Sequence, residues 1–329
     1  MRILIVDRGS IPALLYGGTE RVIWGLGLEL VKMGHQVTYL VHRNSHCDFA
    51  QIIPIDEHRG IVEQIKGDFD IVHFHFQPDN LESLRLPYVI TMHGNLNTQE
   101  ALDRNTIFVS KNHAARFQSE VFVHNGLHWE EYPAPDWYLR RNYFHFLGNA
   151  AWRVKNVKGA IDVIKAAKTE KLRVLGGVRF NFNMGIRFTF SSKVRFEGMV
   201  GCDKKTGLLN ASKGLIFPVR WHEPFGLAII ESLYYGAPVF GTPYGSLPEL
   251  ITAEVGFLSN QKSELTEAVL NVAQYSKIDC HDFARENFNS RIMAEHYLNK
   301  YERVLNGEFL NVNPPILKEI QTQKFLEWN

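Results

Sequence analysis

The sequence predicts an α/β protein with two doubly wound, Rossmann-like domains in tandem. Its 329 residues exceed one ordinary domain. Short apolar runs rich in Val, Ile and Phe alternate with helical patterns, and near-continuous hydrophobicity is typical of parallel strands buried on both faces. The alternation stops at residues 130–141, which are polar and contain two prolines, and then restarts. We therefore expect ligands beyond the carboxyl ends of the strands.

The first half of the chain, residues 1–135, opens with a strand–helix–strand unit. Ile23, Leu26 and Leu30 recur at helical spacing and Gly34 follows them, which predicts a helix at residues 18–33. Such a unit between parallel strands is almost always right-handed. The strands expected in this half lie at residues 2–6, 36–41, 70–76, 88–92, 106–109 and 121–124.

The second half, residues 136–290, repeats this rhythm and is expected to form the second domain. Its expected strands lie at residues 143–147, 172–175, 194–197, 214–218 and 238–241. Its expected helices lie at residues 157–168, 206–212, 224–235 and 264–275.

Composition excludes several other classes of protein. A net charge of +1 gives no argument for nucleic-acid binding. Three widely separated cysteines indicate free thiols, and no apolar run reaches the 18 residues of a membrane span. We therefore expect a cytoplasmic protein, with association at the inner membrane surface left open.

The segment of residues 218–250 carries the strongest functional signal. Glu223 and Glu231 are eight residues apart and share a face if a helix begins near Glu223, with Pro224 in its first turn. Taken singly, each carboxylate could instead complement the helix dipole or lie on a solvated face. The first N–H groups of this helix would bind an anion. They belong to Phe225, Gly226 and Leu227.

This segment resembles the retaining GT-B glycosyltransferases, glycosyltransferase family 4 in particular. That family carries Glu-Pro-Phe-Gly-x4-Glu in its C-terminal domain, and residues 223–226 with Glu231 match it. The resemblance implies that Glu223 binds the donor sugar, that Glu231 binds the ribose, and that the N–H groups near Gly226 face the diphosphate. It also implies two domains facing a cleft, with C-terminal helices in residues 291–329 that return to the first domain.

Two sites are expected in the first domain. Gly17 and Gly18 precede the first helix, where the family has a GG-x-E/S-R loop near the donor phosphates or the acceptor. A glycine pair there is otherwise only a turn. His93 follows the strand at residues 88–92 in a Thr-x-His-Gly run, which the family places beside the donor sugar. On residues alone, His93 could merely cap a loop.

A cation site is expected after the strand at residues 143–147. The family has an Arg after Gly148 and a later Lys-Gly pair, but this chain has Asn149. The diphosphate role is therefore transferred to Arg153 and to Lys155 or Lys158, with Lys158 preferred for its following glycine. Cations at a helix start are unfavourable unless an anion binds them. A solvated helix start is the alternative.

The nucleotide base is expected against the backbone after the strand at residues 194–197, at Met199 and Val200. We expect no metal: the Asp-x-Asp string at residues 68–70 opens a strand, and His73 and His75 lack further ligands at recognisable spacing.

The resemblance implies a metal-independent, retaining transfer of a sugar from a nucleotide-sugar donor, UDP- or GDP-linked, to an acceptor hydroxyl. No further cofactor is expected. The acceptor would be a glycan, a lipid-linked sugar or a small molecule. Two alternatives stay open: a nucleotide-sugar epimerase, and a non-catalytic nucleotide-sugar-binding protein, which Asn149 favours.

Overall fold

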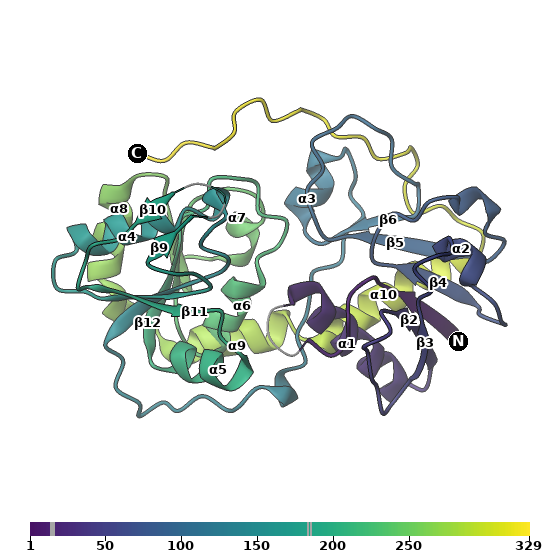
Figure 1. Ribbon diagram of the computed structural model, residues 1–329, viewed down its shortest axis with the longest axis horizontal. Coiled ribbons are helices and arrows are strands. Elements are labelled where there is room, and N and C mark those ends of the chain that lie inside the picture. Colours follow the sequence, from purple (N-terminus) through teal and green to yellow (C-terminus); the bar gives the residue numbers. More distant parts are fainter. Residues whose placement is uncertain (14–16, 183, 185) are drawn as a thin grey trace. The chain divides into compact units, whose positions relative to one another are not determined.

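Each of two units is built round a six-stranded sheet of parallel strands (Figure 1). The computed structural model describes residues 1–13, 17–182, 184 and 186–329. The first unit comprises Met1–Trp129 and Phe288–Gln321, and the second comprises Glu130–Asn287 and Thr322–Asn329. The α/β class with two parallel sheets, predicted from the sequence, is confirmed.

The sheet of the first unit has the order β3-β2-β1-β4-β5-β6. Its strands are β1 (Arg2–Val6), β2 (Gln36–Val41), β3 (Gln51–Pro54), β4 (Ile71–Phe74), β5 (Tyr88–Met92) and β6 (Thr106–Phe108). Its helices are α1 (Gly18–Lys32), α2 (Ile61–Gln64), η1 (Leu81–Ser83), α3 (Lys111–Arg116) and α10 (Ser290–Leu305), and η2 (Trp129–Glu131) ends the unit.

Period-two alternation divides the side chains of β1 between the two faces of this sheet. Leu4 and Val6 join a hydrophobic cluster with residues of β2, β4 and β5. On the other face, α10 packs against α1 and β5. Gly27 in α1 leaves room for the Tyr39 hydroxyl, which donates to the Ile23 carbonyl at 3.2 Å.

A buried histidine joins α10 to the first sheet. His73 of β4 is hydrogen-bonded through Nδ1 to the Tyr301 hydroxyl and through Nε2 to Thr91 Oγ1, both at 2.7 Å. The Thr91 hydroxyl also bonds to Tyr297 at 3.0 Å. Because each buried polar group has a partner here, α10 is held at a defined position on the sheet.

The sheet of the second unit has the order β11-β8-β7-β12-β13-β14, and a two-stranded hairpin lies outside it. The strands are β7 (Tyr143–Leu147), β8 (Leu172–Leu175), β9 (Phe180–Asn181), β10 (Arg187–Phe188), β11 (Val194–Gly198), β12 (Ser212–Phe217), β13 (Val239–Gly241) and β14 (Gly256–Leu258). The helices are η3 (Arg153–Lys155), α4 (Val157–Ala166), α5 (Cys202–Asn210), α6 (Leu227–Tyr234), α7 (Leu247–Leu250), α8 (Lys262–Leu270), η4 (Val272–Gln274) and α9 (Lys277–Asn287).

Helices cover both faces of this second sheet. Residues of α4 and α8 form one hydrophobic core with Phe144, Phe146 and Phe240. On the other face α6 packs against β12, β13 and α9. There His145 is buried, with Nδ1 bonded to Ser212 Oγ at 2.7 Å and Nε2 to Ser232 Oγ at 2.8 Å.

Three expected elements differ from the structure. Residues 121–124 form no strand and make an isolated bridge between Phe108 and Phe122. The helix expected at residues 224–235 begins at Leu227, because Gly226 has a φ of 92° and ends the preceding loop. Helices were expected across residues 291–329, but α10 ends at Leu305 and residues 322–329 belong to the second unit. None of the described helices is long and apolar enough to cross a bilayer.

Buried neutral histidines make stability depend on pH. Burial lowers the pKa of His73, His113 and His145 to about 3. Between that value and the ordinary pKa near 6.5, the unfolded chain binds protons that the folded chain does not. We therefore expect the free energy of unfolding to fall as pH drops below 6.5, by about 1.4 kcal/mol per pH unit for each such histidine.

Denaturant unfolding across this pH range measures the slope. The variant His145→Gln should weaken the dependence of the free energy of unfolding on pH. The variant His58→Gln, at an exposed position, should leave this dependence unchanged. An unchanged slope in His145→Gln would contradict the assignment of a neutral His145.

Candidate active site

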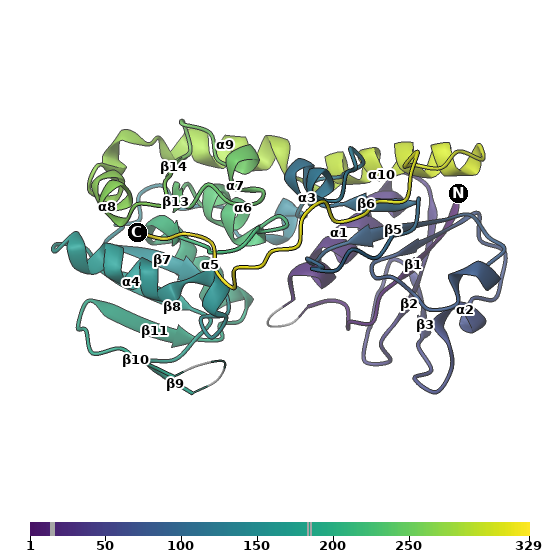
Figure 2. The same ribbon diagram turned by 90° about the horizontal axis from the view of Figure 1, so that it is seen from above.

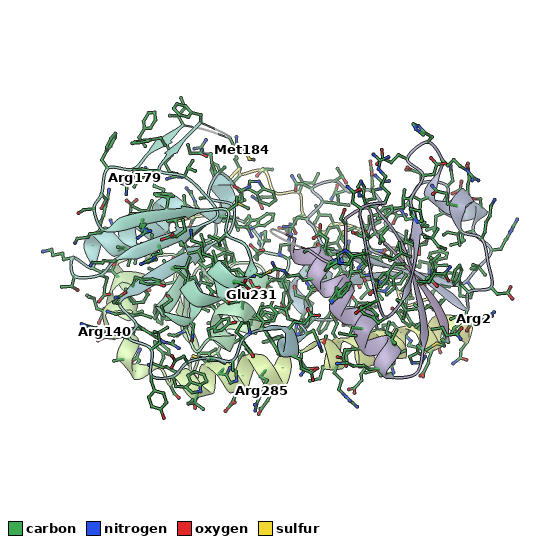
Figure 3. The ribbon with its side chains drawn as sticks, turned by 60° about the horizontal axis from the view of Figure 1, so that its bottom comes forward. Arg2, Arg140, Arg179, Met184, Glu231 and Arg285 are labelled. Carbon is green, nitrogen blue, oxygen red and sulfur yellow. The ribbon has the colours of Figure 1, made fainter. Side chains whose placement is uncertain are left out.

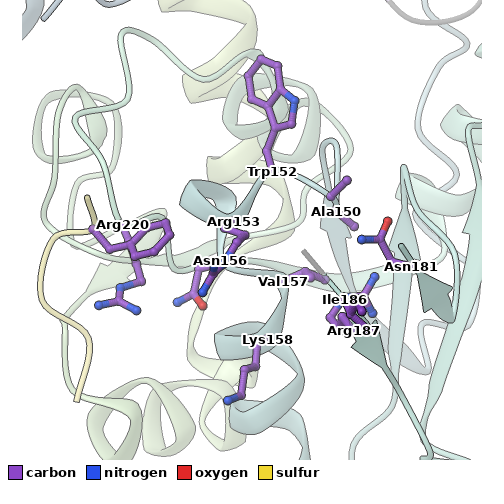
Figure 4. A pocket seen from close by; sticks show the side chains of 12 residues that line it. Ala150, Trp152, Arg153, Asn156, Val157, Lys158, Asn181, Ile186, Arg187 and Arg220 are labelled. Carbon is purple, nitrogen blue, oxygen red and sulfur yellow. The ribbon is translucent and has the colours of Figure 1, made fainter. Parts of the chain in front are cut away.

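A pocket of about 380 Å³ opens at the carboxyl ends of three strands in the second unit (Figure 4). The segments that line it follow β7, β8 and β12, with one residue from the C-terminal tail. Ligands in open α/β sheets bind at such strand ends. The lining residues are Ala150, Ala151, Trp152, Arg153, Asn156, Val157, Lys158, Asn181, Ile186, Arg187, Arg220 and Phe325.

The pocket is positively charged. Arg153, Lys158, Arg187 and Arg220 contribute cations, and none of the described lining residues is acidic. A concave, one-sign site concentrates ligands of the opposite charge. The expected pair Arg153 and Lys158 is therefore brought together, with two further arginines that sequence reasoning missed.

Glycines lie at the carboxyl ends of three strands in the sheet of this unit. Gly148, Gly176 and Gly198 follow or end β7, β8 and β11 with positive φ values of 149°, 113° and 74°. A Cβ on Gly176 would lie 2.2 Å from the Gly148 carbonyl oxygen. The Gly176 N–H donates to the Gly198 carbonyl at 2.7 Å. Only residues without a side chain allow backbones to approach so closely.

Hydrogen bonds fix the loop that carries Arg153. The Arg220 N–H donates to the Val154 carbonyl at 2.7 Å. Asn156 caps α4 by accepting from the Gly159 N–H at 3.0 Å, and its Nδ2 donates to the Pro218 carbonyl at 2.9 Å. The Asn149 Oδ1 accepts from the Ala151 N–H at 3.0 Å, so this side chain shapes the turn.

Glu223 is buried and paired with Lys155. Its Oε2 accepts from Lys155 Nζ at 2.6 Å and from Trp221 Nε1 at 2.8 Å. The carboxylate is thus held by two donors from different loops. Lys155 was the alternative to Lys158 for binding the diphosphate, but it bonds to Glu223 and is absent from the described lining of the pocket.

The turn at Gly245 holds the backbone of Glu223. A Cβ on Gly245 would lie 2.2 Å from the Glu223 nitrogen, and Gly245 has a φ of 65°. The Ser246 N–H donates to the Glu223 carbonyl at 2.9 Å, and Ser246 Oγ donates to the Phe225 carbonyl at 2.6 Å. The loop after β13 therefore fixes the loop after β12.

Glu231 comes from α6 (Figure 3) and is also buried with a cation. Its Oε1 accepts from Lys205 Nζ and, at 2.9 Å, from the Tyr132 hydroxyl. Because α6 begins at Leu227, Glu223 precedes the helix, and the expected shared helical face does not exist. The first turn of α6 starts at Leu227, whereas the side chain of Phe225 is buried in the loop.

His93 follows β5 in the first unit, beside a second histidine. Its Nε2 is hydrogen-bonded to His75 Nδ1 at 2.8 Å, and the two rings stack 5.1 Å apart. Burial lowers the pKa of His93 to about 4, so its ring is neutral at neutral pH. A neutral ring can bond to a sugar hydroxyl. Sequence reasoning rejected His75 as a metal ligand and missed this contact.

Gly17 and Gly18 lie at the start of α1, where carboxylates gather. Gly17 is the N-cap, and a Cβ there would lie 2.7 Å from Glu20 Oε2. Asp7 follows β1, and burial raises its pKa to about 6, with a smaller effect of the nearby Glu20. Arg8 and Arg21 neighbour these carboxylates in the sequence, so the segment carries both signs of charge.

Met199 and Val200 follow β11, beyond the bulge at Gly198. Met199 is 54% exposed, so its side chain is accessible to a ligand. Among the described residues, no group of three or more His, Cys, Asp or Glu side chains is placed to hold a metal ion.

The C-terminal tail completes the pocket of the second unit. Arg153 and Arg220 stack on the ring of Phe325, with guanidinium carbons 5.0 and 5.2 Å from its centre. The Leu326 N–H donates to the Arg220 carbonyl at 2.9 Å, and Trp328 packs against the core. No sequence signal links residues more than 100 positions apart, so this contact had to be seen in the structure.

The region that carries this pocket matches a known family model. Residues 141–274 match the family model described as Glycosyl transferases group 1. The chain is 22% identical to the O-antigen chain mannosyltransferase C of Escherichia coli, over 94% of this chain and 100% of that protein. It is 32% identical over 95 residues to an uncharacterized 41.2 kDa protein in the cps region of Klebsiella pneumoniae, spanning 27% of this chain and 26% of that protein.

Solved structures share the fold. AviGT4, a glycosyltransferase involved in avilamycin A biosynthesis, has a TM-score of 0.76 at 19% identity, over 93% of this chain and 98% of that chain. Anabaena HepE in complex with UDP and glucose has a TM-score of 0.64 at 13% identity, over 92% and 99%. The chain thus shares the fold of these glycosyltransferases, and the region that matches the group 1 model, residues 141–274, lies in the second unit.

Replacing Gly245 tests the role of its turn. Gly245→Ala should destabilise the protein by about 1–3 kcal/mol, because its Cβ meets the Glu223 backbone and φ is positive. Sugar transfer should fall with the displaced Glu223. Gly207→Ala in α5 is the control: its Cβ meets nothing within 4 Å, and it should stabilise by up to about 1 kcal/mol. Equal unfolding midpoints for both variants would refute this role.

Replacing Phe325 tests the tail. Phe325→Ala removes the surface on which Arg153 and Arg220 stack. We expect calorimetry to show a dissociation constant for UDP or GDP raised roughly three- to tenfold. Phe309→Ala is the matched control, because Arg104 stacks on that ring at 3.9 Å in the first unit. Equal affinities in both variants would rule out a positioning role for the tail.

Proposed function

We propose that this protein transfers a sugar from a nucleotide-sugar donor to an acceptor hydroxyl with retention of anomeric configuration, in glycan or glycolipid synthesis. The observation that carries the proposal is the cationic pocket at the strand ends of a group 1 domain. Such a pocket suits the diphosphate of a donor, because guanidinium groups form paired hydrogen bonds to phosphate oxygens.

The diphosphate is assigned to Arg153, Lys158 and Arg220. During transfer the bond between the sugar C1 and the phosphate oxygen breaks, a bond from the acceptor oxygen to C1 forms, and the acceptor proton passes to the departing phosphate oxygen. Negative charge develops on the departing diphosphate. Fixed cations stabilise that charge without reorganising, which lowers the barrier.

The two buried carboxylates are assigned to the donor hydroxyls. Glu223 binds the sugar and Glu231 the ribose, since carboxylates accept from neighbouring hydroxyls. Lys155 and Lys205 neutralise them, so each carboxylate can be buried in the absence of donor. His93 of the first unit, with its neutral ring, is assigned to a sugar hydroxyl near the reacting carbon.

The donor is proposed to be linked to UDP or GDP, and no metal ion takes part in the proposal. UDP is supported by the structural likeness to Anabaena HepE, solved with UDP and glucose. A mannosyl donor in O-antigen synthesis is supported by the likeness to the E. coli mannosyltransferase. A cytoplasmic site of action follows from the same assignment.

Calorimetry with UDP, GDP, ADP and their sugar conjugates identifies the donor. We expect one nucleotide to bind selectively and to raise the unfolding temperature. Glu231→Gln keeps an acceptor for Lys205 and Tyr132 but removes the charge, so affinity should fall roughly tenfold. Glu267→Gln on the exposed face of α8 is the control. Unchanged affinity in Glu231→Gln would place the ribose elsewhere.

Product analysis separates the remaining alternatives. NMR of the product anomer in the presence of EDTA should show retention and undiminished rate. Inversion, or loss of activity with EDTA, would refute the retaining, metal-independent mechanism. Turnover of donor without acceptor would indicate an epimerase, and nucleotide binding without any turnover would indicate a binding protein.

A further inference from the structure

The segment between β8 and β11 presents an apolar surface to solvent. In residues 178–190 apolar side chains occupy every second position, and β9 pairs antiparallel with β10. We call residues 178–190 the aromatic hairpin. Its apolar side chains and their exposures are Val178 52%, Phe180 48%, Phe182 68%, Met184 63%, Ile186 72%, Phe188 50% and Phe190 82%.

The rings of the aromatic hairpin contact one another. Phe180 lies 5.8 Å from Phe188 and 5.7 Å from Phe190, and Phe182 lies 5.6 Å from Phe188, measured between ring centres. Half or more of most of these side chains stays exposed. A contiguous exposed patch of this kind marks an interaction surface in a folded protein.

The topology explains why the patch is exposed. A crossover between adjacent parallel strands is usually a helix that buries its apolar side on the sheet. Here the crossover from β8 to β11 is the aromatic hairpin, and β11 is an edge strand. Figure 2 shows β9 and β10 beyond β11, at the rim of the second unit.

The polar face of the aromatic hairpin is turned toward the protein. Arg179 donates to the carbonyls of Thr189, Ser191 and Val194 at 2.7, 3.2 and 2.5 Å. Asn181 is 7% exposed and lines the pocket with Arg187. In a hairpin that faces water, the polar side chains are exposed and the apolar side chains are buried. In the aromatic hairpin the apolar side chains are the exposed ones.

The chain around the aromatic hairpin is rich in basic residues, although Glu197 at its end forms ion pairs with Arg173 and Arg195. No Asp or Glu occurs between Glu170 and Glu197. The basic residues in this interval are Lys171, Arg173, Arg179, Arg187, Lys193 and Arg195. Aromatic and aliphatic side chains framed by Lys and Arg are the composition that binds anionic membrane interfaces. Two copies of such a surface would repel one another.

We propose that the aromatic hairpin inserts into the surface of an anionic lipid bilayer. Its apolar side chains enter the boundary between headgroups and acyl chains, and the exposed basic residues Lys171 and Arg195 contact lipid phosphates. Asn181 and Arg187 then bring the cationic pocket close to the membrane. This docking surface does not depend on the proposed transfer reaction.

Flotation of the full chain with vesicles tests the proposal. We expect flotation with equimolar phosphatidylcholine and phosphatidylglycerol, weaker flotation with phosphatidylcholine alone, and a decrease at high salt. The double variant Phe182→Ser, Phe190→Ser should lower the partition coefficient at least about tenfold, since two exposed rings no longer bury apolar area. Tyr138→Ser, at a 98% exposed position of the same unit, should float like the wild type.

The unfolding temperature and nucleotide affinity of the double variant are measured alongside, so that loss of folding or of the pocket is distinguished from loss of membrane contact. The proposal would be overturned if the double variant floated as well as the wild type. It would also be overturned if the wild type did not float but sedimented as a dimer while the double variant was monomeric. The surface would then bind a second copy of the chain.

Discussion

Parallel strand pairing is the constraint on which the rest of the second unit depends. Pairing of β7 with β8 and β12 places the carboxyl ends of these strands at one edge of the sheet. The chain must turn there into three separate loops within a small space, and Gly148 and Gly176 allow their backbones to touch. Residues distant in sequence thereby line one pocket.

Charge is distributed in this unit so that the pocket stays cationic. Glu223 and Glu231 are both buried, and neither belongs to the described lining of the pocket. Each is paired with a lysine that neutralises its charge. Buried pairs add little net stability, because desolvation offsets their attraction. Their structural effect is to keep both carboxylates buried beside a cation, while Arg153, Lys158 and Arg220 give the pocket its positive charge.

Two short segments that join or end the regular elements shape the surroundings of the pocket. The C-terminal tail supplies Phe325 to the arginines, and the crossover from β8 to β11 supplies Asn181 and Arg187. Because that crossover is a hairpin, its outward face is left without a covering element. One segment thus borders the pocket and carries the apolar surface, and Ile186 belongs to both.

The sequence by itself determined the α/β class, most strands and part of the pocket lining, Arg153 and Lys158. Continuous apolar runs and the Glu-Pro-Phe-Gly segment are patterns of neighbouring residues, and such patterns can be interpreted without knowing the fold. The start of α6 was misjudged because Pro224 suits a helix, whereas Gly226 adopts a left-handed φ. Only the tertiary structure paired Lys155 with Glu223 and placed Phe325 on the arginines, because contacts between distant residues depend on strand order and register.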